Sequence, residues 1–170
     1  PELSAALIYN PKNYSLRGVI SHLLLGPNLT KSSTSNSVLA QLNPAMVPEL
    51  NLQIDDFWYD KISVGQVNLV THRLPNQLIL DKGVVSAKEY TMNFTGQWTR
   101  DNKQEKTTLV LQANLKDLGQ ALTRWQLNRA ISSGKGEINF DGAWHGNPFA
   151  FSFAGLSGQL GVKIKNGRII

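Results

Sequence analysis

YTMNFTGQW, residues 90–98, alternates between apolar and polar side chains with a period of two. The even positions from Tyr90 to Trp98 hold apolar residues and one glycine, whereas the odd positions hold threonine, asparagine and glutamine. Because successive side chains of a β-strand point to opposite faces, this pattern predicts a strand with one apolar face and one polar face. Such half-buried strands are typical of antiparallel sheets.

Several other segments repeat this alternation and extend the predicted sheet. Their apolar positions are Leu109, Leu111, Ala113 and Leu115, then Ile138, Phe140 and Trp144, then Phe149, Phe151 and Phe153, and finally Leu160, Val162 and Ile164. Earlier in the chain, Leu50, Leu52 and Ile54 alternate in the same way and lead to a turn near Asp60 and Lys61. We expect all of these segments to be strands of one sheet.

Two glycines mark changes in the strand pattern between residues 62 and 90. The alternation shifts phase at Gly65, which predicts a β-bulge. Further along, two short apolar runs flank the tripeptide Asp81, Lys82 and Gly83. A three-residue connection that ends in glycine is typical of a hairpin, so we expect a turn there.

One segment has a helical pattern instead, KDLGQALTRWQ at residues 116–126. Its apolar stripe is formed by Leu118, Ala121, Leu122 and Trp125, and Asp117 stands in front of it as an N-cap. A stripe of this length can lie across one face of a sheet or close one of its ends.

The string Asn-Phe-x-Gly-x-Trp occurs twice, at residues 93–98 and at residues 139–144. Glycine allows a strand to bend, and a tryptophan two residues later on the same face can cover the space that glycine leaves. We therefore interpret each copy as one curved strand, with Trp98 and Trp144 as covers over the glycines. The predicted fold is mostly β: a curved antiparallel sheet forming an open groove or half-barrel, with one short helix.

Length, composition and charge set wide limits on fold and function. A chain of 170 residues with 41% hydrophobic and 17% charged residues is ordinary for one folded domain. The net charge of +5 favours an anionic partner, although the basic residues are scattered along the sequence. The absence of cysteine excludes disulfides and thiol catalysis. No stretch stays apolar for the roughly 18 residues that a membrane-spanning helix needs.

The sequence carries no arrangement typical of an active site or a metal centre. His22, His72 and His145 are far apart, and we interpret each as a lone loop histidine. Asp55 and Asp56 are adjacent, so on a strand they point to opposite faces and cannot share a proton. We expect no enzyme activity, no cofactor and no metal. Nucleic acid is an unsuitable partner because the aromatic residues lie on the apolar face, away from most lysines.

Several short segments between residue 48 and the end of the chain resemble a known family. The segments are Pro48–Ile54, Val64–Val67, Tyr90–Asp101, Leu115–Leu122, Gly134–Pro148, Leu156–Leu160 and Lys165–Arg168. Their order and spacing resemble the carboxy-terminal region of YhdP-type proteins in the AsmA-like family, whereas residues 1–47 match this pattern only loosely. The chain stops at Ile170, where the family continues with a proline- and glycine-containing turn and a leucine-rich stretch.

The resemblance implies a domain organisation. Residues 1–170 would be a single segment of a longer chain, and residues 48–170 would be the AsmA-like carboxy-terminal region. Residues 26–48 are rich in proline, serine, threonine and asparagine, so we expect a mobile loop there.

The resemblance also implies a function. YhdP-type proteins are anchored in the inner membrane of Gram-negative bacteria and cross the periplasm as a long β-sheet folded into a groove, along which phospholipid is thought to move toward the outer membrane. The implied partners are phospholipid and an envelope protein. The implied location is the periplasm, with the membrane reached through segments outside this chain. No catalytic residue would be required.

Under this interpretation the apolar faces of three predicted strands line the groove. The expected lipid-binding residues are Tyr90, Met92, Phe94, Leu109, Leu111, Leu115, Ile138 and Phe140. Two alternatives stay open. The same residues could fill the core of a β-sandwich by themselves. The chain could also be a structural or docking module that joins other envelope proteins by strand addition.

Overall fold

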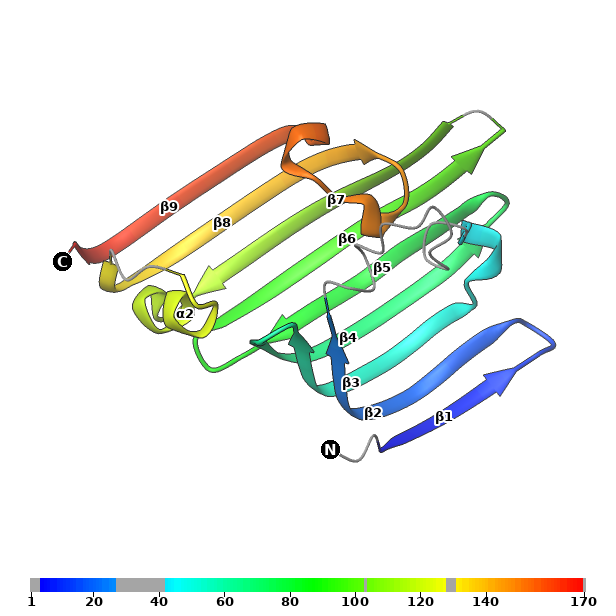
Figure 1. Cartoon of the computed structure of the whole chain (residues 1–170), viewed down its shortest axis with the longest axis horizontal. Helices are drawn as coiled ribbons and strands as arrows, with labels where there is room; N and C mark the ends of the chain where they lie inside the picture. The colour runs from blue at the N-terminus through cyan, green and yellow to red at the C-terminus, as the bar shows by residue number, and fades with distance from the viewer. Residues whose placement is uncertain (1–3, 27–41, 103, 128–130, 170) are drawn as a thin grey trace.

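The fold is a single open sheet in which the strands follow one another in sequence order (Figure 1). The computed structural model describes residues 4–26, 42–102, 104–127 and 131–169. Its strands are β1 (Ala5–Asn10), β2 (Ser15–Leu25), β3 (Glu49–Tyr59), β4 (Ile62–Leu74), β5 (Gln77–Ser86), β6 (Tyr90–Asp101), β7 (Gln104–Leu115), β8 (Ile131–His145) and β9 (Ser157–Ile169). Its helices are α2 (Leu118–Arg124) and the short 3-10 helices η2 (Pro44–Met46), η3 (Pro148–Ala150) and η4 (Phe153–Gly155). The predictions of a mostly β fold, an open sheet and one short α-helix are confirmed.

One pair of strands departs from the expected antiparallel sheet. All neighbouring strands are antiparallel except β2 and β3, which run parallel. Antiparallel neighbours can be joined by a tight turn, whereas parallel neighbours need a long connection. Residues 26–48 supply that length, and β3 starts beside the start of β2, where Ser15 is level with Glu49.

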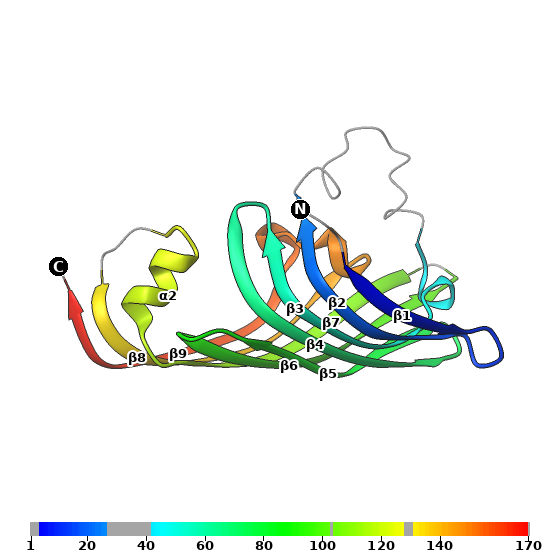
Figure 2. The same cartoon turned by 90° about the horizontal axis from the view of Figure 1, so that it is seen from below.

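The helix α2 follows β7 and lies on one face of the sheet, which we call the helix face (Figure 2). Its N-cap is Asp117, whose carboxylate accepts a hydrogen bond from the backbone N–H of Gln120 at 3.0 Å. The predicted helix and its cap are therefore confirmed. Figure 2 also shows β2, β3 and β4 bending at one end toward the helix face, so these strand ends and α2 rise on the same side of the sheet.

The main hydrophobic core lies between α2 and the sheet. It contains Ile54, Val67, Val85, Tyr90 and Leu115 from the strands, together with Leu118 and Ala121 from α2. Tyr90 and Ala121 are fully buried. Burial of a large apolar side chain contributes roughly 1.5–3 kcal/mol, so this cluster holds the short helix against the sheet.

The two copies of the repeated string lie on β6 and β8, on either side of β7 and in the same register. Phe94 and Phe140 are both level with Leu111 of β7. Trp98 and Trp144 are both level with Thr107 of β7, and both tryptophans are buried. The repeat therefore places two equivalent strands symmetrically about β7.

The predicted hairpin at Asp81, Lys82 and Gly83 is wrong, because these residues lie inside β5. The register with β6 shifts between Leu80 and Gly83, which marks a bulge. The turn that separates β4 from β5 comes earlier and contains Asn76, whose φ is 58°. A Cβ atom at Gly83 would overlap the ring of Phe94. Glycine is therefore required here for space and not for a turn.

No tryptophan atom is among the three nearest atoms to a Cβ built at Gly96 or at Gly142, so neither predicted tryptophan cover is found there. At Gly96 the nearest atoms are backbone atoms of Thr108 and Leu109. The atoms nearest to a Cβ built at Gly142 belong to the Phe140 ring. Phenylalanine rings thus lie over glycines at two places on the helix face, because a strand position without a side chain leaves room for a ring to lie flat.

Two other local predictions have opposite outcomes. The bulge at Gly65 is confirmed, since its φ is 108° and the register of β3 against β4 shifts beside it. The strand predicted across residues 149–153 is wrong, because Phe149 and Ala150 belong to η3, Phe153 begins η4, and the two residues between these helices lie in no strand. The side chains of Asn147 and Ser152 cap the two helices and compete with strand pairing.

Most of the predicted mobile loop, residues 27–41, lies outside the described residues. The part that follows it includes η2, in which Pro44 is buried. The hydroxyl of Tyr14 donates a hydrogen bond to the carbonyl of Met46 at 2.7 Å, and this contact ties η2 to the start of β2.

Candidate functional site

The strand register converts the alternation within each strand into apolar rows that cross the whole sheet. The first row consists of leucine, phenylalanine and glycine: Leu7, Gly18, Leu52, Leu69, Gly83, Phe94, Leu111, Phe140 and Leu160. The second row lies two residues further along each strand and is also apolar throughout: Ala5, Ile20, Ile54, Val67, Val85, Met92, Ala113, Ile138 and Val162. Both rows lie on the helix face and run across the strands, from β1 to β9.

All eight predicted lipid-binding residues lie on the helix face, on β6, β7 and β8. Six of them are half-buried: Met92, Phe94, Leu109, Leu111, Ile138 and Phe140. The other two, Tyr90 and Leu115, are buried beneath α2. The hydroxyl of Tyr90 donates to the carbonyl of Val64 at 2.7 Å, and its ring centre lies 4.9 Å from that of Trp125. Tyr90 and Leu115 thus belong to the core and have no free surface for a ligand.

The most exposed apolar side chains of the rows were absent from the predicted site. On β9, Leu160 is 66% exposed and Val162 is 58% exposed. On β1, Leu7 is 44% exposed. Their alternating pattern is visible in the sequence, but only the register shows that they continue the rows of β6, β7 and β8.

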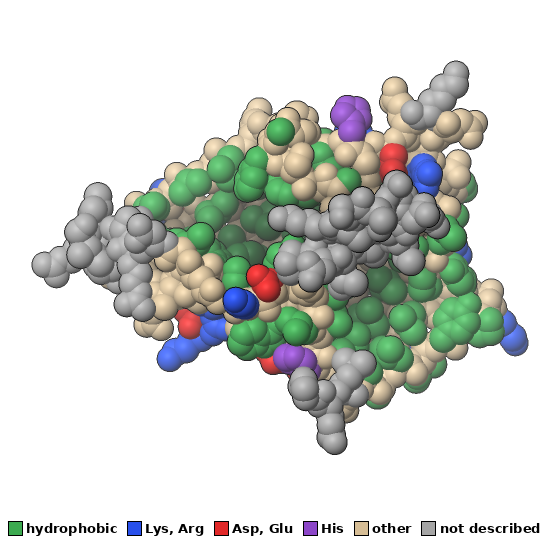
Figure 3. Space-filling view, in the orientation of Figure 1, with side chains coloured by type: hydrophobic (Ala, Val, Ile, Leu, Met, Phe, Trp, Pro, Cys, Tyr) green, Lys and Arg blue, Asp and Glu red, His purple; other side chains and the backbone are tan. Residues whose placement is uncertain are grey.

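The helix face is hollowed and apolar. Figure 3 shows hydrophobic side chains lining hollows in the middle of this face, whereas most charged side chains lie toward its outline. Exposed apolar surface that is continuous over several strands is typical of an interaction site.

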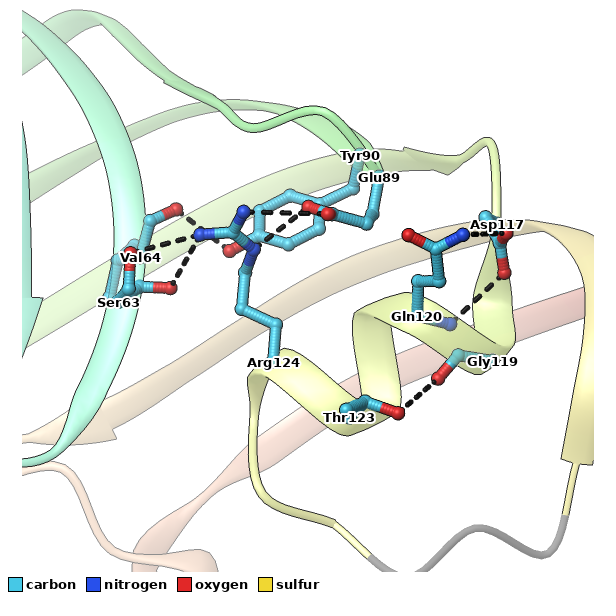
Figure 4. A network of polar contacts seen from close by, with 9 residues as sticks. All are labelled: Ser63, Val64, Glu89, Tyr90, Asp117, Gly119, Gln120, Thr123 and Arg124. Atoms are coloured by element: carbon cyan, nitrogen blue, oxygen red, sulfur yellow. Dashed lines mark hydrogen bonds and ion pairs between the residues drawn. The ribbon is translucent and has the colours of Figure 1, made fainter.

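A polar network fixes α2 to the sheet (Figure 4). Arg124 Nε donates to Glu89 Oε2 at 2.8 Å, and a second nitrogen of Arg124 donates to Ser63 Oγ at 2.9 Å. Glu89 lies in the turn between β5 and β6 and is buried, while Ser63 lies on β4. The hydrogen bond from Arg124 lowers the pKa of Glu89, so its carboxylate stays charged in the pair. Burial raises the pKa of the nearby Tyr90 hydroxyl.

The opposite face of the sheet is polar, and we call it the polar face. Asn93, Gln112 and Asn139 are level with one another across β6, β7 and β8, and all three are exposed. The asparagine of each repeated string is therefore on the polar face, while its phenylalanine is on the helix face. The sheet is thus amphipathic across β6, β7 and β8, whereas on β1 and β2 the polar face also carries Ile8 and Val19, which are 58% and 39% exposed.

The histidines do not lie in loops as predicted. His22 lies on β2, with Nδ1 2.8 Å from Asp56 Oδ2, and His72 lies on β4, with Nδ1 2.7 Å from Asp81 Oδ2. Asp56 also accepts a hydrogen bond from the indole N–H of Trp58 at 2.9 Å, so its carboxylate has two side-chain partners. Within the described ranges, no group of three or more histidine and carboxylate side chains could hold a metal ion.

The fold and this surface define a class of protein: an open β-sheet that presents one apolar face, partly covered by one short helix. The family model of the YhdP protein matches residues 1–170. The chain therefore belongs to the YhdP protein family, and the match includes residues 1–47, which resembled the family only loosely by their sequence pattern. No curated protein and no solved structure matches the chain. None of the helices in the described ranges has the length and apolar character needed to cross a membrane.

Proposed function

We propose that the helix face shelters the acyl chains of phospholipid and conducts them across the strands, as part of a bridge between the inner and outer membranes of a Gram-negative bacterium. The protein would then work in the periplasm, with anchoring segments outside this chain. The observation that carries the proposal is the first apolar row, which continues from strand to strand and whose side chains are all half-buried or exposed. In the second row, Ile54, Val67, Val85 and Ala113 are buried, and the other members are half-buried or exposed. Membership of the YhdP family supports it.

The physical basis of the proposal is the cost of hydrating an acyl chain. Each methylene removed from water gains about 0.8 kcal/mol, so a chain lying along the rows avoids most of the penalty of crossing an aqueous compartment. The rows offer leucine, valine, isoleucine and phenylalanine side chains without a charged group. Such a surface binds hydrocarbon without specific bonds, which allows the lipid to slide.

The experiment uses a photoactivatable phospholipid with the purified chain. Phe94→Asp and Phe140→Asp place a charge in the first row, whereas Asn93→Asp and Asn139→Asp place the same charge on the polar face of the same strands. We expect crosslinking to fall strongly in the first two variants and to remain in the two controls. Equal crosslinking in all four variants, with far-ultraviolet circular dichroism unchanged, would refute the proposal.

A second candidate function is a structural or docking module with a self-filled core. The buried cluster beneath α2 favours it, because Tyr90 and Leu115 already have protein partners there. The two functions differ in bound lipid. Mass spectrometry of the chain purified without detergent should detect phospholipid for a conduit and none for a scaffold.

A further inference from the structure

Four lysines from three separate segments of the sequence meet at one end of the polar face. Lys135 of β8 is level with Lys165 of β9, and Lys163 is level with Glu137. Lys116 directly follows the end of β7. Together they line a depression of about 400 Å³. The basic residues looked scattered in the sequence, and the strand pairing is what gathers them.

This depression holds a large share of the positive charge of the chain. Four lysines and one glutamate give a local charge of +3, compared with +5 for all 170 residues. All four lysines are exposed, and among the described residues none of them forms a salt bridge. Lys61 and Lys88, in the β3–β4 and β5–β6 turns, lie at the same end of the sheet.

We propose that this end of the sheet docks on an anionic phospholipid surface. Each lysine near such a surface is attracted to its negative potential, and several lysines together give binding that depends on salt. Nucleic acid fits less well, because none of the described residues that line the depression is aromatic and could stack on a base. Leu127, beyond α2, is 54% exposed, and Ile164, which lies between Lys163 and Lys165 on β9 but on the helix face, is 47% exposed. A lipid surface accepts apolar side chains next to lysines.

The proposal goes beyond the lipid conduit and uses different residues. The lysines lie on the polar face, whereas the proposed lipid path lies on the helix face. Docking would hold one end of the sheet at a membrane whether or not lipid enters the hollows. The two proposals can therefore fail separately.

The test is flotation of the chain with vesicles of phosphatidylcholine, with and without added phosphatidylglycerol. We compare the native chain with the double variant Lys135→Glu/Lys163→Glu. The matched control is Lys12→Glu/Lys106→Glu, which changes the net charge equally at two exposed lysines toward the opposite end of the sheet. Circular dichroism checks that both variants fold.

We expect the native chain and the control to float with the phosphatidylglycerol vesicles at low salt and to dissociate at high salt. The depression variant should lose at least about 20-fold in apparent affinity, because two attractive charges become repulsive. Crosslinking of the photoactivatable phospholipid to the helix face should remain in this variant. Equal flotation with uncharged vesicles, equal losses in both variants, or no flotation of the native chain would overturn the proposal. Lysine-dependent retention on heparin without flotation would overturn it in favour of a polyanion other than a membrane.

Discussion

The helix face has two regions that are built from the same kind of strand, but one region is buried beneath α2 and the other is exposed. Beneath α2, Leu115 is 4% exposed and belongs to the core. On β9, Leu160 points to the same face and is 66% exposed. The difference is the helix, since α2 covers one end of the face and leaves β9 uncovered. An apolar strand pattern therefore predicts which side chains share a face, but it does not predict which of them remain free to bind a ligand.

Truncation of one leucine in each region should give the largest contrast. Leu115→Ala should lower the free energy of unfolding by about 2–5 kcal/mol, because it leaves a cavity under α2. Leu160→Ala should change it by only about 0.5 kcal/mol, because the side chain is exposed. Urea denaturation followed by circular dichroism measures both. Similar losses in the two variants would show that β9 is covered in solution.

Removal of the Arg124 side chain should weaken the covered region by a smaller amount. Arg124→Gln leaves the buried carboxylate of Glu89 without its charged partner, and we expect a loss of about 2 kcal/mol. The double variant Glu89→Gln/Arg124→Gln should recover part of this loss. The chain has no cysteine, so Ala121→Cys adds a single thiol to the native chain and to each of the two variants. The rate at which this thiol is labelled reports the release of α2 from the sheet. No increase in labelling would mean that apolar packing alone holds the helix.

A methyl group at Gly83 tests the fit of the Phe94 ring in the first row. Gly83→Ala should cost about 1–2 kcal/mol and displace the ring, because the new Cβ would overlap it. At Gly161 the nearest atoms to a new Cβ are 3.9 Å away or more, so Gly161→Ala is the matched control. Thermal unfolding compares the two variants. If the control loses as much stability, the effect comes from the loss of glycine and not from the ring.

The smallest effect should be a pH dependence in the covered region. The pKa of Glu89 is lower in the folded chain than its ordinary value of 4.5. Its contribution to stability is therefore present above pH 4.5 and is lost as the pH falls through the lower folded pKa. Urea midpoints of the native chain and of Glu89→Gln, measured above and below pH 4.5, should differ less at the acidic pH. A constant difference would argue against this ionisation.

The sequence predicted the faces and several local features because these depend on neighbouring residues. The alternation from Tyr90 to Trp98, the cap at Asp117 and the bulge at Gly65 each need only a few adjacent side chains. The hairpin at Gly83 was predicted incorrectly because its glycine serves a contact with Phe94, which lies on the next strand. Local patterns cannot distinguish a glycine needed for a turn from one needed for a distant ring.

The predicted site was correct in its face and wrong in its extent for the same reason. Met92 and Phe94 are half-buried on the helix face, whereas Tyr90 of the same strand has no free surface because α2 lies over it. Leu160 was not predicted as part of the site, although the register places it level with Phe140. Neither the position of α2 nor the register between strands can be read from one segment.

By itself, the sequence determined that this chain forms amphipathic strands and one capped helix, because period and capping are properties of contiguous residues. The tertiary structure alone decided that the apolar positions of nine strands join into two rows, that α2 covers the helix face where β6 begins and β7 ends, and that distant lysines meet at one place. Strand pairing sets these relations, and its hydrogen bonds join residues that no local pattern connects.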